Sequence, residues 1–134
     1  MTKIIAYTDG GARGNPGPAG LGVVLYNEQG KIVSRHKAFL GVQTNNQAEY
    51  KAVIVALTEA LNHGADELEL RADSKLIIEQ LKGNYRVKDK ILGQLFVKVW
   101  NLRHRFKKII LVHVPRARNK VADALANEAM DEGV

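Results

Sequence analysis

The chain has 134 residues, carries a net charge of +6 and contains no cysteine. This length suits one domain with its own core and is too short for two lobes that close on a substrate. The missing cysteines exclude disulfides and thiolate metal sites, and no apolar run approaches the roughly 20 residues that span a bilayer. We therefore expect residues 1–134 to form one soluble, cytoplasmic, monomeric domain without a membrane segment.

The basic residues are concentrated in one part of the chain. Residues 82–120 hold twelve Lys or Arg against a single acidic residue, Asp89, and the rest of the chain is net acidic. A basic segment beside an acidic remainder is typical of proteins that grip a polyanion. A solvated basic surface of this size is also common, so both interpretations stay open here.

Three strands are expected at the start of the chain. Branched and aromatic residues predict a strand at residues 4–8 that ends at Asp9. The Gly- and Pro-rich stretch 10–22 predicts a tight connection into a second strand at 21–27. A turn signal then returns the chain as a third strand at 31–40, which completes an antiparallel meander.

A long helix is expected over residues 45–63, with Thr44 as its N-cap and Gly64 just past its end. The elements expected after it are a strand at 67–72, a short helix from Ser74 to 81, a basic helix at 88–105, a strand at 108–114 and a last helix from about 120.

This order of elements predicts an α/β fold. Three antiparallel strands should be joined by two parallel strands, added through right-handed crossovers, with helices on both faces. The result is a five-stranded mixed sheet.

Four acidic residues occupy places where an ordinary surface charge is not expected. Glu49 lies on the helical stripe of Val53, Ala56 and Ala60, so it should point toward the core, where a charge is costly unless paired. Asp123 lies at the edge of the apolar face of the last helix.

Asp9 and Asp73 each follow a predicted strand, and open α/β sheets bind their ligands at the carboxyl ends of strands. Taken alone, any such acid is usually a cap, a turn residue or a solvated charge. Four acids that converge can instead hold divalent cations against a phosphate.

The segments TDGGARGNPG, NNQAEY, ADS and NKVADALA occur in this order and together resemble the type 1 ribonuclease H family, over residues 5–130. The resemblance implies a ribonuclease H-like sheet and a metal-dependent endonuclease that hydrolyses the RNA strand of RNA/DNA hybrids, leaving 5′-phosphate and 3′-hydroxyl ends. It also implies two Mg²⁺ or Mn²⁺ ions with substrate bound. Their ligands match Asp9, Glu49, Asp73 and Asp123.

The resemblance further implies contacts with the hybrid. Asn15 matches a residue that contacts the nucleic-acid backbone, and residues 45–47 match readers of base edges and 2′-hydroxyls on the RNA strand. Amide side chains both donate and accept hydrogen bonds, as a 2′-hydroxyl requires, although Asn45 suits helix capping equally well. The full expected substrate set is Gly10, Gly11, Asn15, Asn45, Asn46, Gln47 and Lys75.

The chain departs from better-known members of the family in three places. The loop before Asp123 is short, at residues 115–119, and lacks the histidine that helps protonation or product release in many relatives. Arg118 is the candidate catalytic residue there, to steer the scissile phosphate or the product, although an Arg cannot shuttle a proton. Lys75 stands where many relatives have glutamine, so a phosphate contact is expected instead of a hydrogen bond.

The third departure is the absence of an inserted basic helix that some relatives use as a handle for the hybrid. Trp100 is expected at the core or its margin rather than on the substrate. The grip on the hybrid should therefore come from the basic segment, with Lys82, Arg86, Lys88, Lys90, Lys98, Arg103 and Arg105 as candidates.

Two other functions remain open at this stage. One is a catalytically silent module that binds hybrid or double-stranded RNA, although a silent relative should have lost a metal ligand. The other is an ATP phosphotransferase, because its glycine-rich phosphate turn is similar to DGG, although 134 residues cannot supply the second domain such an enzyme needs.

Overall fold

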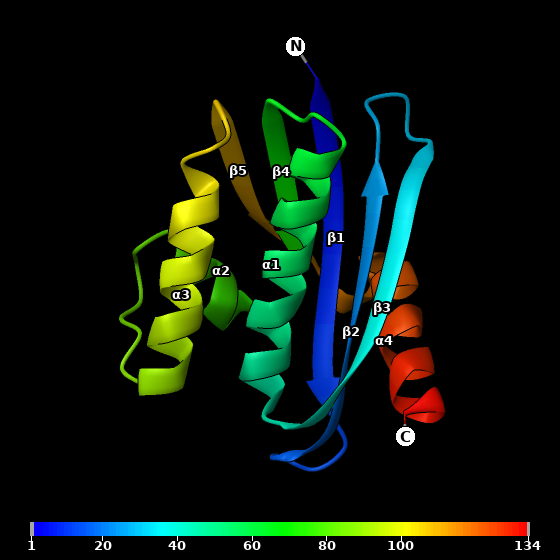
Figure 1. The fold of residues 1–134 in the computed structure, drawn as a ribbon, viewed down its shortest axis with the longest axis vertical. Coiled ribbons are helices and arrows are strands. Elements are labelled where there is room, and N and C mark those ends of the chain that lie inside the picture. The colour runs from blue at the N-terminus through cyan, green and yellow to red at the C-terminus, as the bar shows by residue number, and fades with distance from the viewer. Residues whose placement is uncertain (1, 134) are drawn as a thin grey trace.

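The computed structural model describes residues 2–133. Figure 1 shows a central sheet with helices against it. The elements are, in chain order, β1 (Lys3–Ala12), β2 (Gly17–Tyr26), β3 (Ile32–Gln43), α1 (Asn45–Asn62), β4 (Glu67–Ala72), α2 (Lys75–Leu81), α3 (Lys90–Arg103), β5 (Lys108–His113), a 3₁₀ turn (Arg116–Arg118) and α4 (Lys120–Glu132).

The sheet has the strand order β3-β2-β1-β4-β5. β1, β2 and β3 pair antiparallel, while β4 pairs parallel to β1 and β5 parallel to β4. Helices α1 and α3 lie on one face and α4 lies on the other (Figure 1). The predicted five-stranded mixed sheet with helices on both faces is therefore confirmed.

Helix α1 follows its sequence signals closely. Thr44 accepts a hydrogen bond from the backbone N–H of Gln47, whose side chain accepts from the N–H of Thr44, so the two form a capping box. Gly64, with φ of +75°, follows the helix, as a glycine with positive φ commonly does. The helix buries one stripe against β1 and β2, and Glu49 is only 7% exposed within that stripe.

The glycine-rich stretch contradicts the sequence prediction. β1 continues to Ala12 and β2 begins at Gly17, so the expected connection is mostly strand, and Asp9 lies inside β1 rather than at its end. A Cβ on Gly20 would lie 2.8 Å from the carbonyl oxygen of Ala126 in α4. Glycine at this position lets the helix pack closely on the sheet, a role that sequence alone does not separate from turn formation.

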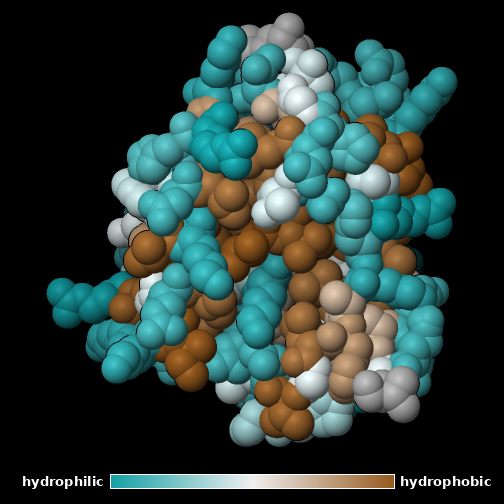
Figure 2. All heavy atoms as spheres, in the orientation of Figure 1, coloured by the Kyte–Doolittle hydropathy of each residue, from teal (hydrophilic) through white to brown (hydrophobic). Residues whose placement is uncertain are grey.

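Trp100 is 46% exposed, so its predicted place at the core or core margin was wrong. Its ring stacks on Phe96 with centroids 6.3 Å apart, and Arg103 lies over it at 5.6 Å. The face that carries α1 and α3 shows apolar areas between hydrophilic side chains (Figure 2). Among residues 2–133, none of the helices has both the length and the apolar character needed to cross a membrane.

Candidate metal centre

The site lies where two strands of the sheet part. β1 and β4 pair in parallel from Lys3 and Glu67 as far as Thr8 and Ala72. Beyond that point β1 continues beside β2 alone, and the chain leaves β4 for α2. Asp9 and Asp73 are the next residues on the two strands, so the end of the parallel pairing brings these two acids together.

Helix α1 covers the edge of β1 that β4 no longer covers. The backbone N–H of Gly10 donates to Oε1 of Glu49 at 2.8 Å, and the N–H of Ala12 donates to Oδ1 of Asn45 at 2.7 Å. A Cβ on Gly10 would overlap the backbone of Ala48 and Glu49. Glycine at this position therefore lets α1 approach closely enough for Glu49 to reach the strand.

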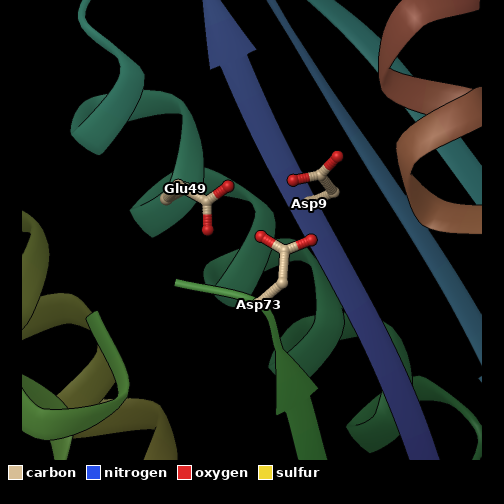
Figure 3. Close-up of side chains that lie close together, drawn as sticks. All are labelled: Asp9, Glu49 and Asp73. Atoms are coloured by element: carbon tan, nitrogen blue, oxygen red, sulfur yellow. The ribbon is translucent and has the colours of Figure 1, made fainter. Parts of the chain in front are cut away.

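The carboxylates of Asp9, Glu49 and Asp73 each offer an oxygen within 4.8 Å of the others. Figure 3 shows the three side chains pointing toward one another from β1, from α1 and from the end of β4. Asp123, from α4 on the opposite face of the sheet from α1, lines the same cavity of about 320 Å³. It stands outside the close group of three and lies 3.5 Å from the guanidinium of Arg116. All four predicted acids thus border one cavity.

Burial makes this cluster hard to charge without a cation. The pKa of Asp9 is raised from its ordinary 3.8 to about 7, mainly by burial and also by Asp123 and Asp73, while a hydrogen bond with Glu49 opposes the shift. Burial also raises the pKa of Glu49 well above its usual range, helped by the charge of Asp9 and opposed by the hydrogen bond from Gly10. These protons belong to the cluster as a whole, and a bound cation would displace them.

The raised pKa of Asp9 gives a testable pH dependence for the metal-free protein. Between about pH 4 and pH 7 the folded state holds a proton on Asp9 that the unfolded chain has lost, so this group lowers the folding stability as pH rises through that window. Asp9→Asn removes the effect, so the variant should gain stability relative to the parent between pH 5 and pH 8, measured by thermal unfolding in EDTA. If the unfolding temperatures of the two proteins changed with pH in the same way, the pKa of Asp9 would not be raised in the folded protein.

Only some of the predicted substrate residues line the cavity, and two of the others hold the backbone at the start of α1. Oδ1 of Asn15 accepts from the backbone N–H of Asn45 at 3.0 Å, and Oε1 of Gln47 accepts in the capping box. Each of these side chains keeps its NH₂ group for another partner. Gly10, Gly11 and Asn45 line the cavity. Asn46, the next residue after Asn45, is half-buried, and Lys75 is exposed at the start of α2.

Arg118 is not brought to the acidic cavity. It lines a different cavity of about 400 Å³, together with Tyr7, Tyr26 and Arg71. Arg116, two residues earlier in the same 3₁₀ turn, lines the acidic cavity instead. Arg118 was predicted from the sequence and Arg116 was not considered, because the directions of the two side chains around a one-turn helix depend on where the turn begins.

Two further residues near the cluster were missed. Asn119 donates to Oδ2 of Asp73 at 2.9 Å, and Arg13 lines the cavity while pairing with Asp131 of α4 at 2.6 Å. His113 lies with Nε2 3.2 Å from the backbone oxygen of Asp73, so it contacts the loop rather than the carboxylates. In the sequence Asn119 looks like an ordinary helix cap, which concealed its contact with the site.

The chain thus has a mixed sheet with an acidic cavity where two strands part, and three of the acids there could hold a metal ion. These features indicate the class of α/β proteins that bind divalent cations at the ends of their strands. The chain matches the family model described as "Reverse transcriptase-like" over residues 7–129. Ribonuclease HI of Halobacterium salinarum is 47% identical over 97% of this chain, and its crystal structure superposes with a TM-score of 0.95, covering 98% of this chain and 99% of that one.

Ribonuclease H of Ruthia magnifica is 39% identical, with 98% of both chains covered. The structure of LC11-RNase H1 in complex with an RNA/DNA hybrid is 46% identical, with a TM-score of 0.90 and 96% and 97% of the two chains covered. This chain belongs to the ribonuclease H family. It spans 65% of the length of the Halobacterium relative and 36% of a Mycobacterium tuberculosis relative, the bifunctional protein Rv2228c.

Proposed function

We propose that the protein is a ribonuclease H, an endonuclease that hydrolyses the RNA strand of RNA/DNA hybrids with divalent cations and leaves 5′-phosphate and 3′-hydroxyl ends. The observation that carries the proposal is the group of Asp9, Glu49 and Asp73, with oxygens within 4.8 Å of one another in a cavity that Asp123 also lines. Family membership supports the reaction class, and a relative solved with a hybrid supports the substrate.

The residues present fit a hard divalent cation. Mg²⁺ and Mn²⁺ favour oxygen donors, and the cluster offers only carboxylate oxygens. The pKa values of Asp9 and Glu49 are raised mainly by burial and also by the charges of neighbouring acids, and a bound cation would offset both effects. Asp9, Glu49, Asp73 and Asp123 would hold the ions, of which we propose two with substrate bound. Held by these four carboxylates, the ions would supply a lowered pKa of the attacking water and charge stabilisation of the leaving 3′ oxygen.

The chain itself would position the hybrid. Within residues 2–133 the NH₂ groups of Asn15 and Gln47 make no hydrogen bond, so they could donate to the hybrid while the oxygens of the same side chains hold the start of α1. The starts of α1 and α3 lie at the same end of the molecule in Figure 1, which supports a contact between the hybrid and the basic loop before α3. The exposed cations of this loop are Lys82, Arg86 and Lys88, and the exposed Lys90 is the first residue of α3.

Binding of the hybrid should depend steeply on salt if this loop touches the phosphates. With about five phosphates contacted, the logarithm of affinity should fall against the logarithm of salt concentration with a slope of roughly −4 to −5. Replacing Arg86 with Ala should make the slope shallower by about 1. Lys31→Ala, in the exposed turn between β2 and β3, is the control and should leave the slope unchanged. A parent slope near zero would remove the loop from the interface.

The reaction itself is tested with end-labelled RNA/DNA hybrid, duplex RNA and duplex DNA, each incubated with MgCl₂ or MnCl₂ and with EDTA. We expect cleavage of the RNA strand of the hybrid only when metal is present, with termini that a ligase accepts as 5′-phosphate. Tight binding of the hybrid without cleavage under any metal would instead indicate a catalytically silent binding module. Cleavage of duplex RNA would add double-stranded RNA to the substrates.

A further inference from the structure

Asn119 lies where three of the acid-bearing segments meet. Its side chain is 1% exposed and donates to the backbone oxygen of Thr8 at 2.8 Å and to Oδ2 of Asp73 at 2.9 Å. Its backbone oxygen accepts from the N–H of Asp123 at 3.0 Å. One residue therefore contacts the strand just before Asp9, the carboxylate of Asp73 and the backbone of Asp123.

The neighbours fix the orientation of this amide. Nδ2 of Asn119 carries two hydrogens, and both acceptors in reach, the oxygen of Thr8 and Oδ2 of Asp73, need a donor. A flipped amide would place Oδ1 against these two oxygens with no hydrogen between them. In the observed orientation Oδ1 is buried without a hydrogen-bond partner within residues 2–133. A buried acceptor in that state is destabilising, so the two donated bonds are made at the expense of a third.

Asn119 also forgoes the usual role of its position. It is the residue before α4, where Asn ordinarily accepts a hydrogen bond from the first turn of the helix. Its side chain makes no such capping bond within the described chain. The residues before α1, α2 and α3 all cap their helices through their side chains. The side chain of Asn119 is thus directed to the carboxylate cluster rather than to its helix.

We propose that Asn119 is a positioning residue for the metal centre. It holds the carboxylate of Asp73 through Oδ2 and ties this acid to β1 at Thr8. Without it the half-buried carboxylate of Asp73 could rotate away from Asp9 and Glu49. Groups that hold a metal ligand by a hydrogen bond typically change metal affinity by about 10–100-fold when removed. The proposal rests on the proposed function, because it assumes that the cluster binds metal.

The test compares metal binding by the parent and by Asn119→Ala. Calorimetric titration with MnCl₂ should show about tenfold weaker binding in the variant. The metal concentration that half-saturates cleavage should rise by a similar factor, while KM for the hybrid stays the same. The control is Gln80→Ala. Gln80, in α2, also has a buried amide side chain, and its oxygen accepts a hydrogen bond from the Tyr50 hydroxyl at 2.7 Å. That variant should lose stability without any change in metal affinity.

A measurement on the unaltered protein keeps the proposal testable if Asn119→Ala fails to fold. In a titration with MgCl₂ followed by NMR, the side-chain amide of Asn119 should shift with the same midpoint as the backbone amide of Asp73, and the side-chain amide of Gln80 should not. The positioning role alone would be overturned if a folded Asn119→Ala bound metal as tightly as the parent, or if the NMR signal of the Asn119 side-chain amide did not shift in the titration. A parent protein that binds no metal and cuts no hybrid would overturn the proposed function instead.

Discussion

Asp9→Asn should abolish hydrolysis of the hybrid while leaving its binding largely intact. The substitution keeps the shape of the side chain but removes the charge of a residue that interacts with both Glu49 and Asp123 in the acidic cavity. We expect the rate to fall by more than about a thousandfold, the upper end of what loss of one preorganised electrostatic group costs. Single-turnover cleavage at saturating MgCl₂ and a separate binding assay in EDTA measure the two effects.

A matched control for this variant is Glu28→Gln. Glu28 is an exposed acid in the turn between β2 and β3, so neutralising it should change neither cleavage nor binding. Because the Asn side chain relieves the buried repulsion, Asp9→Asn should also unfold at a higher temperature than the parent in EDTA at pH 8. Substantial residual cleavage by Asp9→Asn would count against a catalytic centre at this cluster.

Gly10→Ala should damage both the fold and the site. The new Cβ would overlap the backbone of Ala48 and Glu49, and backbone atoms cannot move aside as a flexible side chain can. Overpacking of this kind typically costs about 1–3 kcal/mol. Helix α1 would have to move away from β1, which would also lengthen the 2.8 Å contact between the N–H of Gly10 and Glu49. Denaturant unfolding and hybrid cleavage should therefore both report a loss.

The control for Gly10→Ala is Gly93→Ala. Gly93 lies inside α3, and a Cβ there meets no atom of the described chain within 4 Å. Because Ala favours a helix interior more than Gly, this variant should gain about 0.5–1 kcal/mol of stability and keep its activity. If Gly10→Ala were as stable and active as the parent, α1 would have to pack on β1 less tightly than the structure shows.

The elements that could be predicted are those with local signals. The capping box at Thr44 and Gln47 fixes the start of α1, and Gly64 marks its end within one residue. The burial of Glu49 followed from helical periodicity, and the bounds of β4 from its alternating pattern. These features depend on the chain within a few residues of each position, which is why sequence alone was enough.

The features that could not be predicted depend on contacts between distant segments. Gly20 looks like part of a turn until α4 is seen packing on the strand. Arg116 and Arg118 look interchangeable until the 3₁₀ turn directs them to different cavities. Asn119 looks like a cap until its partners, 46 and 111 residues away, are known. Each of these features depends on what a neighbouring element does, which no local pattern records.

The two bonds from α1 to the edge of β1 also bear on how the protein behaves in solution. A strand edge with free backbone N–H groups invites the strand of another molecule, the first step of many aggregates. At the parting of the sheet, Glu49 and Asn45 already accept from Gly10 and Ala12. The fold thus leaves a cavity where β1 and β4 part, and the N–H groups of β1 at that place are already bound, so an incoming strand cannot pair with them there.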